Sequence, residues 1–354
     1  MATMPYYPET IRTSTAAALT LGLKRGRFYR NARLGCINVL LTYPDGCRAN
    51  CAYCGLARQR SGRDASKSFI RVDWPVVRTD VLIDAMNGKI DRLRRICISM
   101  ITHDRAADDT LALTRILKES VNLPISLLIT PTQVDRHMLA LFHEAGADRI
   151  GIAVDAATPE IFDRYRGGMV HGPHRWDRYW ECFDDAVTEF GRGFVGSHLI
   201  VGLGETEKDM VSAFWKTCQA GGVTHLFSFY PEPGSFLHHQ PPPPLASYRR
   251  MQLARYLIDT GVVTNTDCVF DSSGTLRAFS KPGLNLDRLI ESGRPFETSG
   301  CPGNDGEVAC NRPFANSEPG PDVRNLPYRA TNDDIDRIRM SLGADFLTNR
   351  HSVR

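Results

Sequence analysis

Six short apolar runs constrain the fold of this chain more than any other feature of its sequence. They are rich in Val, Ile and Leu and nearly continuous in apolar residues: 36–43, 96–101, 125–130, 149–154, 194–200 and 225–230. Such runs are typical of parallel strands that are buried on both faces. We therefore expect a sheet whose strands are covered on both sides.

Longer segments with helical periodicity separate these runs: 76–95, 108–120, 134–147, 175–191 and 207–222. Thr132 or Asp135, and Thr206, are candidates for residues that begin a helix. Strands that alternate with helices predict an α/β fold with a parallel sheet, as a barrel or as an open sheet. Because six units fall short of an eight-stranded barrel, we expect a partial (β/α)6 TIM-like barrel.

The alternation divides the chain into three expected regions. Residues 1–30 form an N-terminal lead-in, residues 31–235 the partial barrel, and residues 236–354 a loop-rich C-terminal extension. A proline-rich passage after Tyr230 marks the second boundary. Two later segments, SYRRMQLARYLIDTG and DDIDRIRMSLGADF, have helical character.

Charge and hydropathy exclude some classes of protein. The 354 residues include 43 basic and 40 acidic side chains, so the net charge of +3 gives no reason to expect nucleic-acid or membrane binding. No run approaches the roughly 18 apolar residues of a membrane-spanning helix. The N-terminus lacks the leading basic region of a signal peptide. We expect a cytoplasmic protein.

Three of the ten cysteines fall in CRANCAYC, residues 47–54, directly after the first apolar run. In parallel barrels, functional residues gather on loops at the carboxyl ends of the strands. Thiolates suit zinc or iron–sulfur clusters, and structural zinc usually has four protein ligands. Three thiolates leave one iron of a four-iron cluster open, which favours a reactive cluster. A zinc site or three incidental thiols is the alternative.

The spacing CxxxCxxC, with an aromatic residue before the last cysteine, resembles the radical S-adenosylmethionine (SAM) superfamily. The resemblance implies that Cys47, Cys51 and Cys54 hold a [4Fe–4S] cluster. Its open iron would chelate the amino and carboxylate groups of SAM. Electron transfer from the cluster would then release a 5′-deoxyadenosyl radical.

The same resemblance implies further cofactor-binding residues. The backbone around Tyr53 would lie near the adenine, and GLGET (202–206) would place Gly202 and Glu205 near the adenine and methionine ends of SAM. A simple strand-to-helix turn explains GLGET equally well. The second run ends in ISMITHD instead of a Gly-Gly-Glu-like sequence, so Ser99 and Thr102 are the candidates for contact with the amino group.

A later segment, VDAATPEIFDRYRGG (154–168), resembles the fourth-strand region of the biotin synthase-like branch. The resemblance implies that Asp155 approaches the ribose and that Arg164 or Arg166 pairs with the methionine carboxylate. A charged, exposed helix face is the alternative for the arginines. The histidines of HGPHRW and FLHHQ could be acid–base groups or metal ligands, but we expect them to be solvated loop residues.

A second set of cysteines, Cys268, Cys301 and Cys310, lies in Gly- and Pro-rich loops. Such loops can wrap an iron–sulfur cluster, so these residues are candidates for an auxiliary cluster. Its fourth site would be open or filled by a group such as Ser272, Ser273, Ser299 or Arg312. The alternative is two buried thiols and one exposed thiol. Cys97, Cys182 and Cys218 are expected to act as small buried hydrophobes.

Several phrases resemble one subunit of the archaeal-type two-component lipoyl synthases: LKRGRFYRNARLGCINVLLTY, GCRANCAYCGLARQR, CISMITH, and GCP followed by CNRPFANSEPG. The resemblance implies sulfur insertion into an octanoyl chain on a carrier-protein lysine, with an auxiliary cluster as the sulfur donor. It implies three partners: the octanoylated carrier protein or peptide, a second radical SAM subunit, and an electron donor such as ferredoxin or flavodoxin. The chain lacks the cysteine-rich N-terminal motif of bacterial lipoyl synthase.

Two other functions stay open at this point. One keeps the radical chemistry but makes the chain a biotin synthase-like mutase, a methylating enzyme or a ring-forming enzyme. The other is a non-catalytic iron–sulfur module for redox transfer or sensing.

Overall fold

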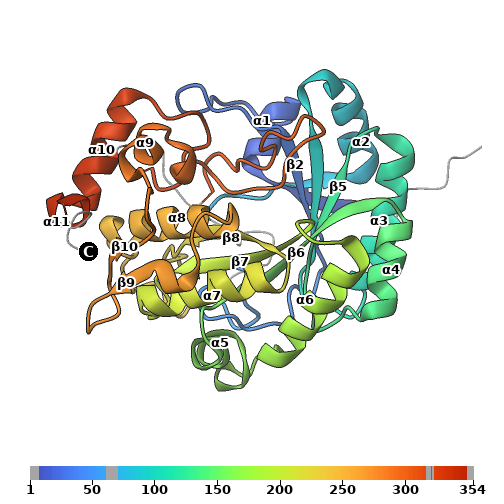
Figure 1. Ribbon diagram of the computed structural model, residues 1–354. Helices are drawn as coiled ribbons and strands as arrows, with labels where there is room; N and C mark the ends of the chain where they lie inside the picture. Colours follow the sequence, from blue (N-terminus) through green and yellow to red (C-terminus); the bar gives the residue numbers. More distant parts are fainter. Residues whose placement is uncertain (1–7, 61–70, 316–319, 321–322, 349–354) are drawn as a thin grey trace, which may run out of the picture.

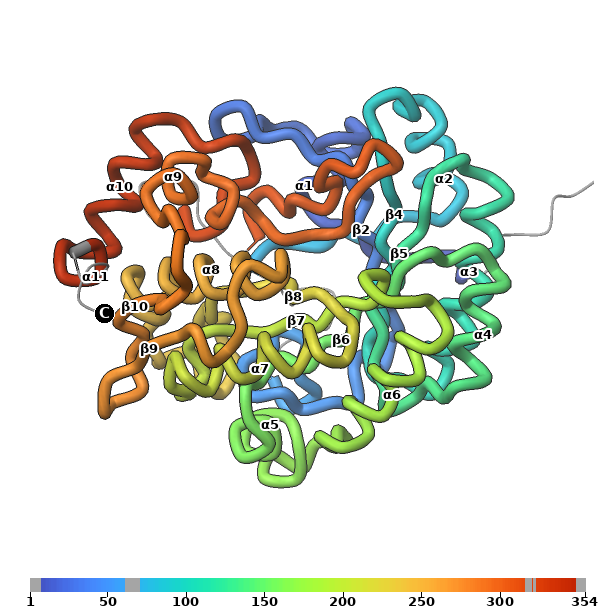
Figure 2. The backbone as a smooth tube through the Cα atoms, in the orientation of Figure 1, coloured from blue at the N-terminus to red at the C-terminus, as the bar shows by residue number. Residues whose placement is uncertain are grey.

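A computed structural model describes residues 8–60, 71–315, 320 and 323–348 (Figures 1 and 2). The first seven residues of the lead-in and residues 316–319 of CNRPFANSEPG lie outside this part. The strands are β1 (Thr10–Thr13), β2 (Cys36–Leu40), β3 (Val76–Arg78), β4 (Arg95–Ser99), β5 (Ile125–Ile129), β6 (Ala147–Asp155), β7 (Val195–Val201), β8 (Val223–Ser228), β9 (Cys268–Phe270) and β10 (Leu276–Phe279).

The α-helices are α1 (Thr15–Leu21), α2 (Thr79–Asn87), α3 (Ala106–Ser120), α4 (Arg136–Glu144), α5 (Pro159–Arg166), α6 (Trp176–Phe190), α7 (Glu207–Gln219), α8 (Leu245–Asp259), α9 (Leu286–Glu291), α10 (Asn332–Leu342) and α11 (Ala344–Thr348). Short 3-10 helices occupy Ile90–Arg92, Gly168–Val170, Asn265–Asp267 and Arg294–Phe296.

The main sheet is a partial barrel. Its strands lie in the order β3-β1-β2-β4-β5-β6-β7-β8, and every neighbouring pair from β2 to β8 is parallel. All six apolar runs are strands of this parallel part, so the predicted partial (β/α)6 barrel is confirmed. Helices α2, α3, α4, α6 and α7 cover its outer side (Figure 1).

The lead-in adds to the sheet in a way that the sequence pattern did not indicate. Strand β1 pairs antiparallel with β2, and β3 pairs antiparallel with β1. These strands have only four and three residues, too few for a period-two pattern to stand out. The predicted helix at 76–95 is correspondingly shorter and begins at Thr79, after β3.

Side-chain caps fix where the helices begin. Asp135 accepts a hydrogen bond from the backbone N–H of Met138, and Thr206 forms a reciprocal capping box with Asp209. Both residues were sequence candidates, and both are N-caps. Thr132 instead faces a histidine in the candidate site described below.

The inner wall of the barrel is lined by small and polar residues near the beginnings of the strands. Asn38 pairs in register with Cys97, and Cys97 with Ser126. His198 pairs with His225. Neighbouring residues in parallel register point to the same face of a sheet, and all five of these side chains line one cavity inside the barrel.

A glycine makes room for one of these histidines. A Cβ atom at Gly196 would lie 2.6 Å from two ring atoms of His225. No side chain fits there without moving the imidazole. The absence of a side chain at Gly196 of β7 therefore leaves room for the His225 ring inside the barrel.

The C-terminal extension covers the open side of the barrel at β8. Ser299 Oγ accepts a hydrogen bond from the N–H of Leu226, and the Asn325 side chain donates to the Leu226 carbonyl. On the other side of the opening, Asn311 donates to the carbonyl of Arg33, just before β2. Figure 2 shows this orange-to-red segment running from α9 and α10 to β2. The unpaired edge of β8 is thereby hydrogen-bonded to the tail.

No helix among the described residues combines the length and the hydropathy that crossing a bilayer requires.

We predict that Gly196→Ala destabilises the fold by about 1–3 kcal/mol, because the new methyl group overlaps the His225 ring. Urea unfolding of the cluster-free protein would measure the change. Gly88→Ala is the matched control, since its Cβ would meet only ordinary contacts, at 3.5 Å or beyond. Equal stability of the two variants would contradict this account of the inner wall.

Candidate active site

The three motif cysteines line one cavity at the carboxyl end of the parallel strands. Cys51 is buried, and Cys47 and Cys54 are half-buried. Their loop is tied to two neighbouring segments, since Arg48 N–H donates to the Thr102 carbonyl and Ala52 N–H donates to that of Tyr165. The loop is thus held from the β4 side and from α5.

Burial sets the protonation of these thiols. It raises the pKa of Cys51 to about 12 and that of Cys54 well above its ordinary value. A metal must therefore displace protons as it binds, which makes binding dependent on pH. Among the described residues, no three His, Cys, Asp or Glu side chains are placed to ligate a single metal ion. The ligands of a four-iron cluster bind separate irons around a cube.

Asp155, at the end of β6, connects the cysteine loop to α5. The β6–β7 register shifts just before this residue, and its backbone lies in the left-handed region at φ 64°. A bulge of this kind re-aims a side chain. The carboxylate accepts hydrogen bonds from Tyr53 Oη at 2.6 Å and from the Arg166 guanidinium at 2.7 Å.

Arg166 is a buried cation on the wall of the cavity. Besides the Asp155 carboxylate, it donates to the Tyr179 hydroxyl at 2.9 Å and to the carbonyls of Ala153 and Val154. Burial opposes its charge, but Tyr179, Tyr53 and Asp155 hold the pKa of Arg166 well above its ordinary value. The cavity therefore contains a fixed guanidinium with one carboxylate partner.

His174 extends this network and corrects a sequence expectation. It belongs to HGPHRW and was expected to be solvated, yet it is buried and lines the cavity. Its Nδ1 lies 2.7 Å from Thr132 Oγ1 and 3.1 Å from the Tyr179 hydroxyl. Burial and then the charge of Arg166 lower the pKa of His174 well below its ordinary value. The residue folds inward because hydroxyl groups satisfy its ring.

A second cavity lies deeper in the barrel and shares three wall residues with the first: Leu128, His198 and Phe227. Cys97, Cys301 and Cys310 line it. Two of the predicted auxiliary cysteines are therefore close together, and the strand residue Cys97 joins them. Cys97 was expected to be an inert buried thiol, but it lines this cavity with the tail cysteines because its register position faces inward.

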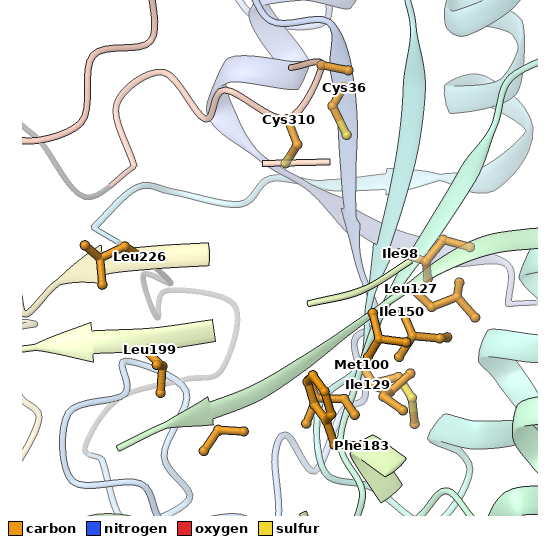
Figure 3. Close-up of a cluster of buried hydrophobic side chains, with 14 of the residues drawn as sticks. Cys36, Ile98, Met100, Leu127, Ile129, Ile150, Phe183, Leu199, Leu226 and Cys310 are labelled. Carbon is orange, nitrogen blue, oxygen red and sulfur yellow. The ribbon is translucent and has the colours of Figure 1, made fainter. Parts of the chain in front are cut away.

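Cys36, at the start of β2, completes the group (Figure 3). The Asn38 amide lies 3.5 Å from the sulfur of Cys310 and 3.8 Å from that of Cys36. Burial raises the pKa of Cys36, whereas the thiols of Cys36 and Cys97 donate to Cys310 and lower its pKa well below the ordinary value. Cys310 is thus the thiol of this group that the surroundings favour as a thiolate.

Cys268 lies apart from this group. It begins β9 in the β9–β10 hairpin, its sulfur is 3.7 Å from the carbonyl oxygen of Thr264, and it does not line the second cavity. Sequence proximity to other loop cysteines does not determine where a hairpin lies in the fold.

A family model with the description "Radical SAM superfamily" matches residues 41–214. The match contains the cysteine loop, Asp155 and Arg166. Residues 41–214 are a radical SAM domain. A domain of this superfamily supports an enzyme and implies a [4Fe–4S] cluster with SAM. No curated protein sequence matches the chain.

Solved structures are similar to this chain at low sequence identity. HydG, a maturase of the [FeFe]-hydrogenase, is similar with 12% identity and a TM-score of 0.51 over 69% of this chain and 53% of HydG. This chain therefore spans about half of that protein. Methylornithine synthase (PylB) is similar with 14% identity and a TM-score of 0.48 over 77% of this chain and 81% of PylB. HemN, the coproporphyrinogen III oxidase from Escherichia coli, has 15% identity and a TM-score of 0.37 over 60% of this chain and 50% of that chain.

The radical SAM cavity contains only some of the cofactor-binding candidates. Tyr53, Asp155 and Arg166 line it, as does Thr102, but Ser99 lines the second cavity instead. Arg164 is exposed on α5, with its guanidinium 6.0 Å from the ring of Tyr165. Sequence reasoning missed Thr130, Tyr179 and Glu232, which line the cavity from separate segments and form no motif.

Gly202 and Glu205 brace their own loop and do not line the SAM cavity. The Glu205 carboxylate accepts hydrogen bonds from the N–H groups of Gly202 at 2.7 Å and Leu203 at 2.9 Å. Gly202 has φ 107°, and a Cβ atom there would lie 2.7 Å from Pro243. These contacts favour the strand-to-helix turn interpretation of GLGET.

We predict that Arg166→Lys lowers SAM cleavage at least tenfold (~1.4 kcal/mol), because an ammonium cannot reproduce the several contacts of the guanidinium. The formation of 5′-deoxyadenosine under strong reduction measures this loss. Arg164→Lys, two residues earlier on the same helix, is the control and should match the wild type. Equal loss in both variants would mean that α5 is merely disturbed.

The raised pKa of the Glu205 carboxyl group should make the free energy of unfolding depend on pH. Burial raises its pKa from 4.5 to about 6 in the folded state. Protonation therefore favours the folded state, and this stabilisation is full below pH 4.5 and is lost as the pH rises through about 6. The shift corresponds to about 2 kcal/mol, and we predict that Glu205→Gln removes this contribution to the pH dependence.

Urea unfolding of the cluster-free protein between about pH 4.5 and 7.5 would test this. The exposed Glu160→Gln on α5 is the control and should keep the wild-type profile. An unchanged profile in Glu205→Gln would show that burial does not raise the pKa of Glu205 in the folded protein.

Proposed function

We propose that this radical SAM enzyme inserts sulfur into an unactivated C–H bond, with an octanoyl chain on a carrier-protein lysine as its substrate. The observation that carries the proposal is the pair of adjoining cavities. The motif cysteines line one, and three of the group of four thiols, Cys97, Cys301 and Cys310, line the other. A substrate carbon activated in the first cavity would lie one wall of side chains away from the second.

The residues present fit a cluster with SAM in the first cavity. Three thiols from one loop face it, and the Tyr53–Asp155–Arg166 network offers a hydroxyl, a carboxylate and a guanidinium at its side. Arg166 is suited to a carboxylate such as that of methionine. When bound, the cluster and SAM supply the radical that removes a hydrogen atom from the substrate.

The remaining wall of this cavity is largely apolar, which suits an aliphatic chain. Its apolar side chains include Met100, Ile101, Leu128, Ile129, Ile200, Phe227 and Phe229. Such a wall also excludes water from a reactive intermediate.

The proposed partners are a second radical SAM subunit and an electron donor. The electron donor, a ferredoxin or a flavodoxin, would reduce the cluster.

We predict that Cys51→Ala abolishes both 5′-deoxyadenosine and any sulfur-containing product, whereas Cys310→Ser keeps 5′-deoxyadenosine within about threefold (~0.7 kcal/mol) and loses the product. The reaction would be followed by mass spectrometry, with reconstituted enzyme, SAM, a strong reductant and an octanoyl-lysyl peptide. Cys182→Ser, a buried thiol of α6, is the control for loss of a thiol as such.

Three outcomes would contradict parts of the proposal. Sulfur-containing product from Cys310→Ser would remove the donor role of the second cavity. A rearranged, methylated or cyclised product without added sulfur would favour the other radical reactions. No SAM cleavage by the wild type would favour a redox or sensing module.

A further inference from the structure

Three separated parts of the chain bring four cysteines together inside the barrel. Cys36 comes from β2 and Cys97 from β4, whereas Cys301 and Cys310 come from the tail. The family match at 41–214 includes only Cys97. The group as a whole is therefore a property of this chain and not of the matched domain.

The tail presents its two cysteines on a narrow turn. The N–H groups of Ala309 and Cys310 both donate to the Cys301 carbonyl, at 3.0 and 3.1 Å. A Cβ atom at Gly300 would lie 2.1 Å from the Cys310 carbonyl oxygen, so only glycine allows this approach. The backbone thus fixes the spacing of the two thiols without any bound group.

The turn is clamped to the base of the barrel. The buried Arg95 on β4 donates through Nε to the Pro302 carbonyl at 2.6 Å and forms a bidentate ion pair with Asp148. A bidentate pair fixes the orientation of the guanidinium, and the Arg95 side chain itself is buried. This clamp therefore holds the tail thiols in a fixed position relative to Cys36 and Cys97.

The charge around the cavity suits an anion. The Arg312 guanidinium lies 4.2 Å from the centre of the Phe227 ring and donates to the Ser299 carbonyl. Its Nε is buried and has no hydrogen-bond partner within the described residues. None of the described residues lining the cavity carries a carboxylate. A cation in this position calls for negative charge in the cavity, and a thiolate-ligated iron–sulfur cluster supplies it.

His225 adds a nitrogen atom beside Cys301. Its Nδ1 lies 3.2 Å from the Ser299 carbonyl oxygen, which can only accept, so Nδ1 carries the proton. Nε2 is then free of hydrogen and lies 3.9 Å from the sulfur of Cys301. A backbone carbonyl that orients a ring in this way is typical of the surroundings of metal-binding histidines.

We propose that Cys36, Cys97, Cys301 and Cys310 bind a second iron–sulfur cluster inside the barrel, with His225 facing it beside Cys301. This ligand set retains two tail cysteines, omits Cys268, and takes Cys36 and Cys97 from strands. The role of this cluster as the sulfur source rests on the proposed function, whereas its binding does not.

The decisive variant lacks the three motif cysteines, and so the first cluster, but keeps all four cysteines of the second group. The variant with Cys47→Ala, Cys51→Ala and Cys54→Ala would be reconstituted with iron-57 and sulfide without oxygen. Iron, sulfide and zinc would be counted per chain, and Mössbauer spectra recorded. We expect about two to four irons with matching sulfide. No iron in this variant, or one zinc per chain in place of iron and sulfide, would overturn the proposal.

Single substitutions in the same background identify the ligands. Cys310→Ser and, separately, Cys97→Ser should lower the iron content at least fivefold or shift the Mössbauer parameters, while Cys268→Ser should leave both unchanged. Circular dichroism of each variant would show that it is folded. Retained iron and an unchanged spectrum in folded Cys310→Ser and Cys97→Ser, or loss of iron in Cys268→Ser alone, would overturn the ligand set. Because no substrate is added, failure of sulfur insertion would leave these results intact.

Discussion

A sheet of six parallel strands cannot close on itself, and this gap governs the arrangement of the protein. The β8 edge would expose unpaired backbone groups beside an interior that contains polar side chains. Ser299 and Asn325 of the C-terminal extension satisfy the Leu226 backbone, and Asn311 reaches the segment before β2. The extension is thus the missing wall of the barrel, and it brings its own cysteines into the interior.

The two cavities differ in how each stabilises charge. In the radical SAM cavity, the buried Arg166 has Asp155 as a direct partner, so the cation is compensated before any ligand binds. In the deeper cavity, Arg312 rests on an aromatic face, and the lining residues of the described part include no carboxylate. The first arrangement suits a ligand with both charges, such as a zwitterion, and the second suits an anion.

The sequence was sufficient for the parallel strands and the cysteine loop, because each depends on a contiguous pattern. It did not reveal β1 and β3, which are too short, or the inward position of His174, which depends on the distant Thr132. Cys36 and Cys97 lie in apolar runs, and only the register with neighbouring strands shows which residues face inward. Cys268 was grouped with the tail cysteines by loop composition, which carries no information about distance in space.

The contact between Asn38 and Cys310 joins residues 272 positions apart. A ribosome makes β2 well before Cys310, so the barrel interior stays accessible until the tail has been synthesised. Closing so long a loop is also entropically costly and tends to be slow. The order of synthesis therefore leaves an interval in which the strands have formed but the last wall is absent. Whatever the interior holds can enter during that interval, before the tail seals it.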